Sequence, residues 1–157
     1  MNDIIRRGKK ADLPAVFALI KELALFERAP HEVTNSLTQL EQDGFGDTPL
    51  YGFFVAEAEG NIVGLSLYYY RYSTWKGKRL FLEDIIVTES YRGRGIGKKL
   101  FDKTMQQTLD DQCSGMSWQA LDWNEPALNF YKSYGAKLDG EWINCTLEVN
   151  QIKRLLL

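Results

Sequence analysis

Apolar and polar residues follow distinct periods along the first third of the chain. Residues 4–10 (IIRRGKK) begin with an apolar pair and predict a short strand. Residues 11–28 repeat apolar positions near helical spacing, so they predict an amphipathic helix with Asp12 as its N-cap. Residues 34–46 predict a second, shorter helix that ends at Gly44.

The middle of the chain is richer in β-branched and aromatic residues. Residues 51–73 contain two such runs joined at residues 59–61 (EGN), which is the pattern of a β-hairpin. Residues 79–87 (RLFLEDIIV) predict the next strand, and residues 96–112 return to helical spacing. The inner side of this helix is expected to carry Leu100, Phe101, Met105 and Leu109.

The last part of the chain predicts four more elements. A strand is expected in residues 114–123 and a helix in residues 124–136. Residues 136–143 (AKLDGEWI) and 145–152 (CTLEVNQI) predict a final pair of strands. This order of strands and helices predicts one α/β domain over residues 1–157, with a mixed sheet and helices on its faces.

The charge distribution narrows the functional classes. The formal net charge is −2 at pH 7, which disfavours a general nucleic-acid binder. Positive charge is concentrated locally, at Arg92, Arg94, Lys98 and Lys99. Such a cluster favours a small polyanion over a long duplex, although a solvated surface patch has the same pattern.

Cysteine and histidine positions predict no metal site. Cys113 and Cys145 lie in no metal-ligand spacing, and His31 has no Cys or His near it. We expect two free thiols in a reducing compartment. The N-terminal residues lack the apolar core of a secretory signal, and no apolar run approaches the ~20 residues of a membrane helix. These features predict a cytoplasmic protein without a membrane partner.

A glycine-rich stretch, RGRGIG, separates the predicted strand at 79–87 from the following helix. It is no Walker loop, because Arg92 stands where the first glycine belongs and Lys99 where Ser or Thr should hold magnesium. It is no dinucleotide fingerprint either, because Lys98 replaces the third glycine. The remaining pattern, R-x-x-G-x-G, favours anion binding by backbone amides and a helix N-terminus, with an ordinary glycine-rich turn as the alternative.

The stretch VTESYRGRGIGKKL resembles the pyrophosphate-binding motif of the GNAT superfamily of acyl-CoA N-acyltransferases. The segments LIKELALFE, DGFGDTPLY, STWKGK, FLEDIIV and LDWNEPALNFYKSYGA extend the resemblance to the diamine (spermidine/spermine) N-acetyltransferases, closest to their thialysine branch. This resemblance implies a single domain with a central mixed, mostly antiparallel, twisted sheet flanked by helices on both faces. It also implies acetyl-CoA as co-substrate, a small polyamine or lysine-like (thialysine) amine as acceptor, and a homodimer.

The resemblance assigns a coenzyme-binding set. The pyrophosphate would bind the loop formed by Arg92, Gly93, Arg94, Gly95, Ile96 and Gly97. The pantetheine arm would pair with the backbone of Ile85, Ile86 and Val87, whose side chains also suit simple core packing. Asn124 would contact the coenzyme or only cap its helix, and Ala127 replaces a serine common in the diamine enzymes.

Two residues are implied to carry the chemistry. Tyr131 matches the tyrosine that protonates the leaving sulfur, and a phenol with a reference pKa near 10 keeps its proton at neutral pH. The alternative for Tyr131 is a packed core aromatic. Glu83 matches the glutamate that binds the amine and accepts its proton. Strand alternation sends its neighbour Asp84 to the opposite face, and a buried structural pair is the alternative reading.

Phe26, Glu27 and Glu141 match substrate-contacting positions of the diamine enzymes. Glu27 and Glu141 would hold a second cationic centre, or else lie at a solvated helix end and hairpin. The sequence therefore predicts acetyl transfer by direct attack in a ternary complex. Acetylation of a protein or peptide amine, a non-catalytic acyl-CoA-binding module and a nucleotide- or RNA-binding domain are the rival functions.

Overall fold

The computed structural model describes residues 3–157, and the chain divides into two compact units, Met1–Gln119 and Ala120–Leu157. The first unit contains a five-stranded sheet in the order β1-β2-β3-β4-β5. Its strands are β1 (Ile4–Arg7), β2 (Gly52–Ala58), β3 (Asn61–Ser73), β4 (Gly77–Val87) and β5 (Met116–Trp118). Neighbouring strands are antiparallel except β4 and β5, which are parallel, so the expected mixed, mostly antiparallel sheet is confirmed.

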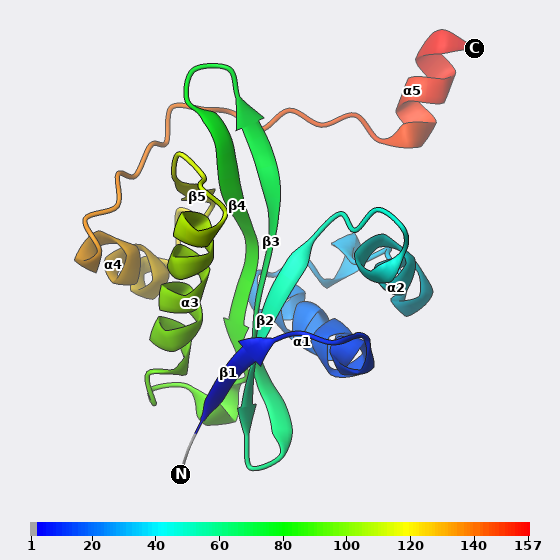
Figure 1. The fold of residues 1–157 in the computed structure, drawn as a ribbon. Helices are drawn as coiled ribbons and strands as arrows, with labels where there is room; N and C mark the ends of the chain where they lie inside the picture. Colours follow the sequence, from blue (N-terminus) through cyan, green and yellow to red (C-terminus); the bar gives the residue numbers. More distant parts are fainter. Residues whose placement is uncertain (1–2) are drawn as a thin grey trace. The chain divides into compact units, whose positions relative to one another are not determined.

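Helices cover both faces of this sheet (Figure 1). The helices of the first unit are η1 (Lys10–Asp12), α1 (Leu13–Phe26), η2 (Pro30–Glu32), α2 (Leu37–Phe45), η3 (Glu89–Tyr91) and α3 (Ile96–Asp110). Helix α1 packs on one face through a core that includes Leu13, Val16 and Leu65. Helix α3 packs on the other face through a second core. The sheet is therefore buried between α1 and α3.

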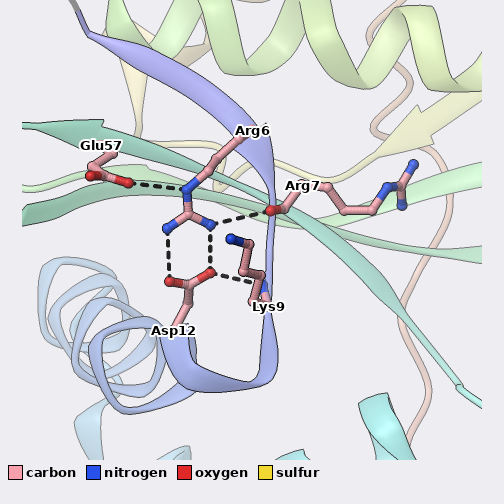
Figure 2. A network of polar contacts seen from close by, with 5 residues as sticks. All are labelled: Arg6, Arg7, Lys9, Asp12 and Glu57. Atoms are coloured by element: carbon pink, nitrogen blue, oxygen red, sulfur yellow. Dashed lines mark hydrogen bonds and ion pairs between the residues drawn. The ribbon is translucent and has the colours of Figure 1, made fainter.

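An ion-pair network fixes the junction between β1 and α1 (Figure 2). The guanidinium of Arg6 binds both carboxylate oxygens of Asp12, at 2.8 and 2.9 Å, and donates through Nε to Glu57 at 3.0 Å. Asp12 precedes α1 as expected, but its carboxylate accepts from the backbone N–H of Lys9 at 2.7 Å and not from the helix. The hydrogen bonds from Arg6 lower the pKa of Asp12. The Asp12 side chain, predicted to cap α1, thus bonds the backbone at the start of η1 and the guanidinium of Arg6.

Two helix predictions need correction. Helix α2 ends at Phe45 with Gly46 as C-cap, so Gly44 lies inside it. On α3, Leu100 and Phe101 are buried as expected, but Leu109 is 69% exposed and the inner row continues through Thr104 and Thr108. Apolar residues alone predicted the wrong inner face, because the two threonines can be buried. The hydroxyl of Thr104 donates to the carbonyl of Leu100, and that of Thr108 donates to the carbonyl of Thr104.

The predicted final strands do not form. In the second unit, α4 (Glu125–Ser133) is followed by residues 137–148 without a strand and then by α5 (Val149–Leu156). Glu148 and Gln151 form a capping box, in which the backbone N–H of Glu148 donates to Gln151 Oε1 at 2.8 Å. This local signal starts a helix inside the segment 145–152 that alternation predicted as a strand.

Candidate functional site

A β-bulge at Glu83 interrupts the ladder between β3 and β4. Leu67 pairs with Asp84 and Tyr68 pairs with Leu82, so Glu83 is the additional residue. The parallel pairing of β4 with β5 also ends here, since it runs only from Leu80 to Leu82. Within the described residues no strand pairs with this edge of β4 beyond Leu82. The backbone of residues 83–87 therefore borders an open strand edge next to an exposed carboxylate.

Three carboxyl groups near this bulge act on one another through their charges. Burial, followed by repulsion from Glu83 and Glu27, raises the pKa of Asp84 to about 7. Burial and the charge of Glu83 raise the pKa of Glu27, which directly follows α1. The expectation that Glu83 and Asp84 point to opposite faces assumed a regular strand, but the bulge interrupts the alternation there, and both residues interact with Glu27 through their charges. The cluster of Glu27, Glu83 and Asp84 is suited to attract a cation.

Tyr69 belongs to the same region and was missed by the sequence reasoning. It lies two residues after Leu67, the partner of Asp84, on the same face of β3. Its pKa is raised by burial and by the charge of Glu83, and its ring lies 5.3 Å from that of Phe81. Counting alternation back from Asp84 across the hairpin would have found it, once the bulge was known.

The glycine loop after β4 forms a bare turn at the start of α3. Gly93 and Gly95 have φ of +77° and +79°, and a Cβ added at either would meet no atom within 4 Å. Gly95 is the N-cap of α3, and the next helical hydrogen bond runs from Lys99 N to Gly95 O. The N–H groups of Ile96 and Gly97, in the first turn of α3, therefore have no acceptor within the helix. Open space at Gly93 and Gly95, together with the N-terminus of α3, fits a phosphate group.

The charged side chains of this loop are held by local contacts. The guanidinium of Arg92 donates through Nε to the carbonyl of Val87 at 2.8 Å and lies 5.3 Å from the ring centroid of Phe26. Arg94 lies 4.7 Å from the ring centroid of Tyr91. Arg92, expected at the coenzyme, thus also joins β4 to Phe26, expected at the substrate. Ile96 is buried, so only its backbone is available to a ligand.

Three predicted site residues belong to the second unit. Asn124 accepts through Oδ1 from the N–H of Ala127 at 3.4 Å, which is the expected helix cap. Tyr131 lies on α4, is buried, and its ring centroid is 5.5 Å from that of Phe130. Glu141 lies in the exposed segment after α4, where its N–H donates to Asp139 at 3.0 Å.

Residues 3–157 contain neither a metal-binding cluster nor a membrane-spanning helix. No group of three or more His, Cys, Asp or Glu side chains in this range is arranged to hold a metal ion. No helix within the range has the length and apolarity needed to span a membrane.

Comparison with known proteins gives a consistent result. The Acetyltransferase (GNAT) family matches residues 15–136. A thialysine N-epsilon-acetyltransferase from Bos taurus is 44% identical over 142 residues, covering 85% of this chain and 84% of that protein. The Mus musculus protein of the same name is 41% identical over 141 residues, covering 85% and 83%. Among solved structures, aminoglycoside N-acetyltransferase AAC(6')-Iy in complex with CoA has a TM-score of 0.76 at 20% identity, covers 93% of this chain and 95% of that one, and supports the fold alone.

Proposed function

This chain belongs to the acetyltransferase (GNAT) family and is an acetyl-CoA-dependent N-acetyltransferase, and we propose that its acceptor is a primary amine of a small lysine-like (thialysine) or polyamine cation. The cluster of Glu27, Glu83 and Asp84 beside the open edge of β4 carries this proposal. The names of the relatives that are 44% and 41% identical support the same class of acceptor.

The carboxylate cluster suits an amine that arrives charged. An alkyl amine has a pKa near 10.4 and is mostly ammonium at neutral pH. Glu27 and Glu83 would attract this cation, and Phe26 and Glu141 complete the proposed acceptor set. Nucleic acid and membranes are not proposed as partners, because the net charge of −2 and the local carboxylates favour a small cation.

The loop of residues 92–97 and the backbone of residues 85–87 are proposed to hold acetyl-CoA, with Asn124 as a further contact. Support comes from the open space at Gly93 and Gly95 and from the end of β5 pairing at Leu82. Bound acetyl-CoA supplies an acetyl group activated as a thioester. A backbone N–H of Ile85, Ile86 or Val87 would donate to the thioester carbonyl, an interaction that strengthens as negative charge develops on the oxygen.

We propose direct attack in a ternary complex. Glu83 accepts a proton from the ammonium, directly or through water, and the freed nitrogen forms a bond with the acetyl carbon while the carbon–sulfur bond breaks. Tyr131 donates its phenolic proton to the departing sulfur. The nitrogen loses a second proton on amide formation, and exchange with solvent restores Glu83 and Tyr131. No residue becomes acetylated.

Release of free thiol from acetyl-CoA with a panel of amines tests this function. Thialysine, lysine, ornithine, spermidine and putrescine are compared with a lysine-containing peptide and with an aliphatic alcohol. We expect thiol release with one or more of the small amines and little with the peptide. Preference for the peptide would establish protein acetylation instead. Binding of coenzyme without thiol release from any amine would leave a non-catalytic acyl-CoA-binding module.

We further propose one catalytic domain over residues 1–157 that works as a homodimer in the cytoplasm. Trp142 and Ile143 are 76% and 87% exposed, and Leu155 and Leu156 are exposed on α5, so the second unit presents apolar surface that a second copy would cover. The two thiols, Cys113 and Cys145, are free, as suits a reducing compartment. Sedimentation velocity gives the oligomeric state, and a monomer at micromolar concentration would overturn the dimer.

A further inference from the structure

The carboxylate of Glu22 joins α1 to the segment that follows β4. It accepts from the hydroxyl of Thr88 at 2.9 and 3.1 Å and from the backbone N–H of Glu89 at 3.1 Å. It also forms an ion pair with Arg92, with Nη2 and Oε1 3.7 Å apart. These partners occupy residues 88–92, between the last residue of β4 and the first glycine of the loop. The Glu22 side chain on α1 thus binds residues along the segment 88–92, which leads into the glycine loop.

Each contact fixes a different part of this segment. The N–H of Thr88 donates to the carbonyl of Val63 at 2.8 Å, so Thr88 is held by β3 through its backbone and by Glu22 through its hydroxyl. Glu89 is the first residue of η3, and its N–H has no acceptor within that turn. Arg92 directly follows η3 and also donates to the carbonyl of Val87. Glu22 therefore contacts both ends of η3, through the N–H of Glu89 and the guanidinium of Arg92.

We propose that Glu22 is a positioning residue for acetyl-CoA, because it fixes the backbone path from Thr88 to Arg92 and so orders the amides of residues 93–97 before the coenzyme binds. This inference rests on the proposed use of the loop as the coenzyme site. Glu22 does not touch the coenzyme, since a carboxylate repels a pyrophosphate. Its effect is preorganisation: a loop already held in one conformation loses less entropy on binding.

The hydrogen-bond pattern separates Glu22 from a simple ion pair. Glu22 and Arg92 are both partly exposed, with side-chain accessibilities of 33% and 41%, and ion pairs of this kind contribute little. The bonds from Thr88 and Glu89 need only an acceptor oxygen. The Glu22→Gln variant supplies such an oxygen and loses the charge, whereas Glu22→Ala loses both.

The test compares three variants of the full chain with a control. The dissociation constant of CoA is measured by calorimetry, and the KM for acetyl-CoA and kcat by thiol release. We expect Glu22→Ala to raise both the dissociation constant and the KM for acetyl-CoA about tenfold, with kcat changed less than about twofold. Glu22→Gln should restore affinity to within about threefold, and Thr88→Val should weaken it less than Glu22→Ala. The control Glu41→Ala removes a different carboxylate, which lies on α2 and pairs with Lys10 of η1, and this variant should change neither constant.

The outcomes separate this inference from the function on which it rests. If the unmodified chain binds CoA and Glu22→Ala binds it equally well, the positioning role is wrong and the acetyltransferase function stands. If Glu22→Gln loses as much affinity as Glu22→Ala, the charge and not the hydrogen bonds acts, which also overturns the proposed bracing. Should Glu22→Ala fail to fold, Thr88→Val decides, since an unchanged dissociation constant would overturn the proposal. Absence of CoA binding by the unmodified chain would overturn both.

Discussion

Glu83 and Asp84 are consecutive in the sequence, yet both carboxyl groups interact with Glu27 at the end of α1. The bulge in β4 makes this possible, because the pair Leu67–Asp84 is followed by the pair Tyr68–Leu82. The strand thus concentrates negative charge at the point where β5 leaves it.

Asp84 should make stability depend on pH. Burial, Glu83 and Glu27 raise the pKa of Asp84 in the folded state to about 7, above its ordinary value of 3.8. The folded chain therefore holds this proton more tightly than the unfolded chain. The resulting stability is present at low pH and is lost as the pH rises from about 4 through 7, by at most about 4 kcal/mol. Urea denaturation at pH 4.5 and pH 8 checks this, with Asp84→Asn as the comparison. The prediction would be contradicted if the free energies of unfolding of the wild type and of Asp84→Asn differed by the same amount at both pH values.

Glu83→Gln should lower kcat about a hundredfold at pH 7, because glutamine keeps the shape but cannot accept the proton of the ammonium. The deficit should shrink towards pH 10, where the free amine is already abundant. Thiol release measured from pH 6 to 10 tests both statements, and Glu41→Gln on α2 serves as the control. A deficit in kcat that does not change with pH would show that Glu83 is not the base.

Tyr131→Phe should reduce kcat about a hundredfold with little change in the KM for acetyl-CoA, since the phenolic proton is needed only as the sulfur departs. Tyr134→Phe is a matched control at the end of the same helix and should retain kcat. Steady-state kinetics of the two variants decide the assignment. Full activity of Tyr131→Phe would remove it as the acid.

Gly95→Ala should weaken CoA binding about tenfold, because the added methyl group occupies open space at the N-cap of α3, where the pyrophosphate is proposed to bind. Gly60→Ala is the matched control, since Gly60 has φ of +78° against +79° for Gly95, and an added Cβ there also meets no atom within 4 Å. Both substitutions should cost about 1–2 kcal/mol of folding free energy, as an alanine at positive φ is strained. Calorimetry with CoA and thermal melting of both variants separate the two effects. Equal CoA affinity in both variants would rule out the glycine loop as the binding site of the pyrophosphate.

Much of the fold follows from local pattern. The hairpin at Glu59 and Gly60, the helices α1, α3 and α4, and the bare turn at Gly95 all have short-range signals, and these elements are present. The inner row of α3 did not follow from apolarity, because the buried hydroxyls of Ser66 and Thr104 lie 2.9 Å apart across the sheet–helix interface. A partner so distant in sequence leaves no periodic signal.

The sequence predicts which residue types form the candidate site, whereas their arrangement depends on pairings between distant strands. The motif around Glu83 identified a carboxylate, but strict alternation separated it from Asp84, and only the register of β3 against β4 reveals the bulge. The role of Glu22 had no signal either, since its partners, Thr88 and Glu89, lie more than sixty positions away along the chain. The strand expected at residues 145–152 did not form for a related reason, because the capping box at Glu148 favours a helix there over the alternating pattern.

The bulge also has an evolutionary consequence. Leu82 and Asp84 already face opposite sides of the sheet, so Glu83 is an insertion between two stretches that are in phase with each other. Deleting its single codon would return β4 to a regular ladder and leave Leu80 and Ile86 in their separate cores. A lineage could therefore gain or lose this carboxylate in one step without rebuilding the sheet, and folded chains that lack it are expected among descendants of the same ancestor.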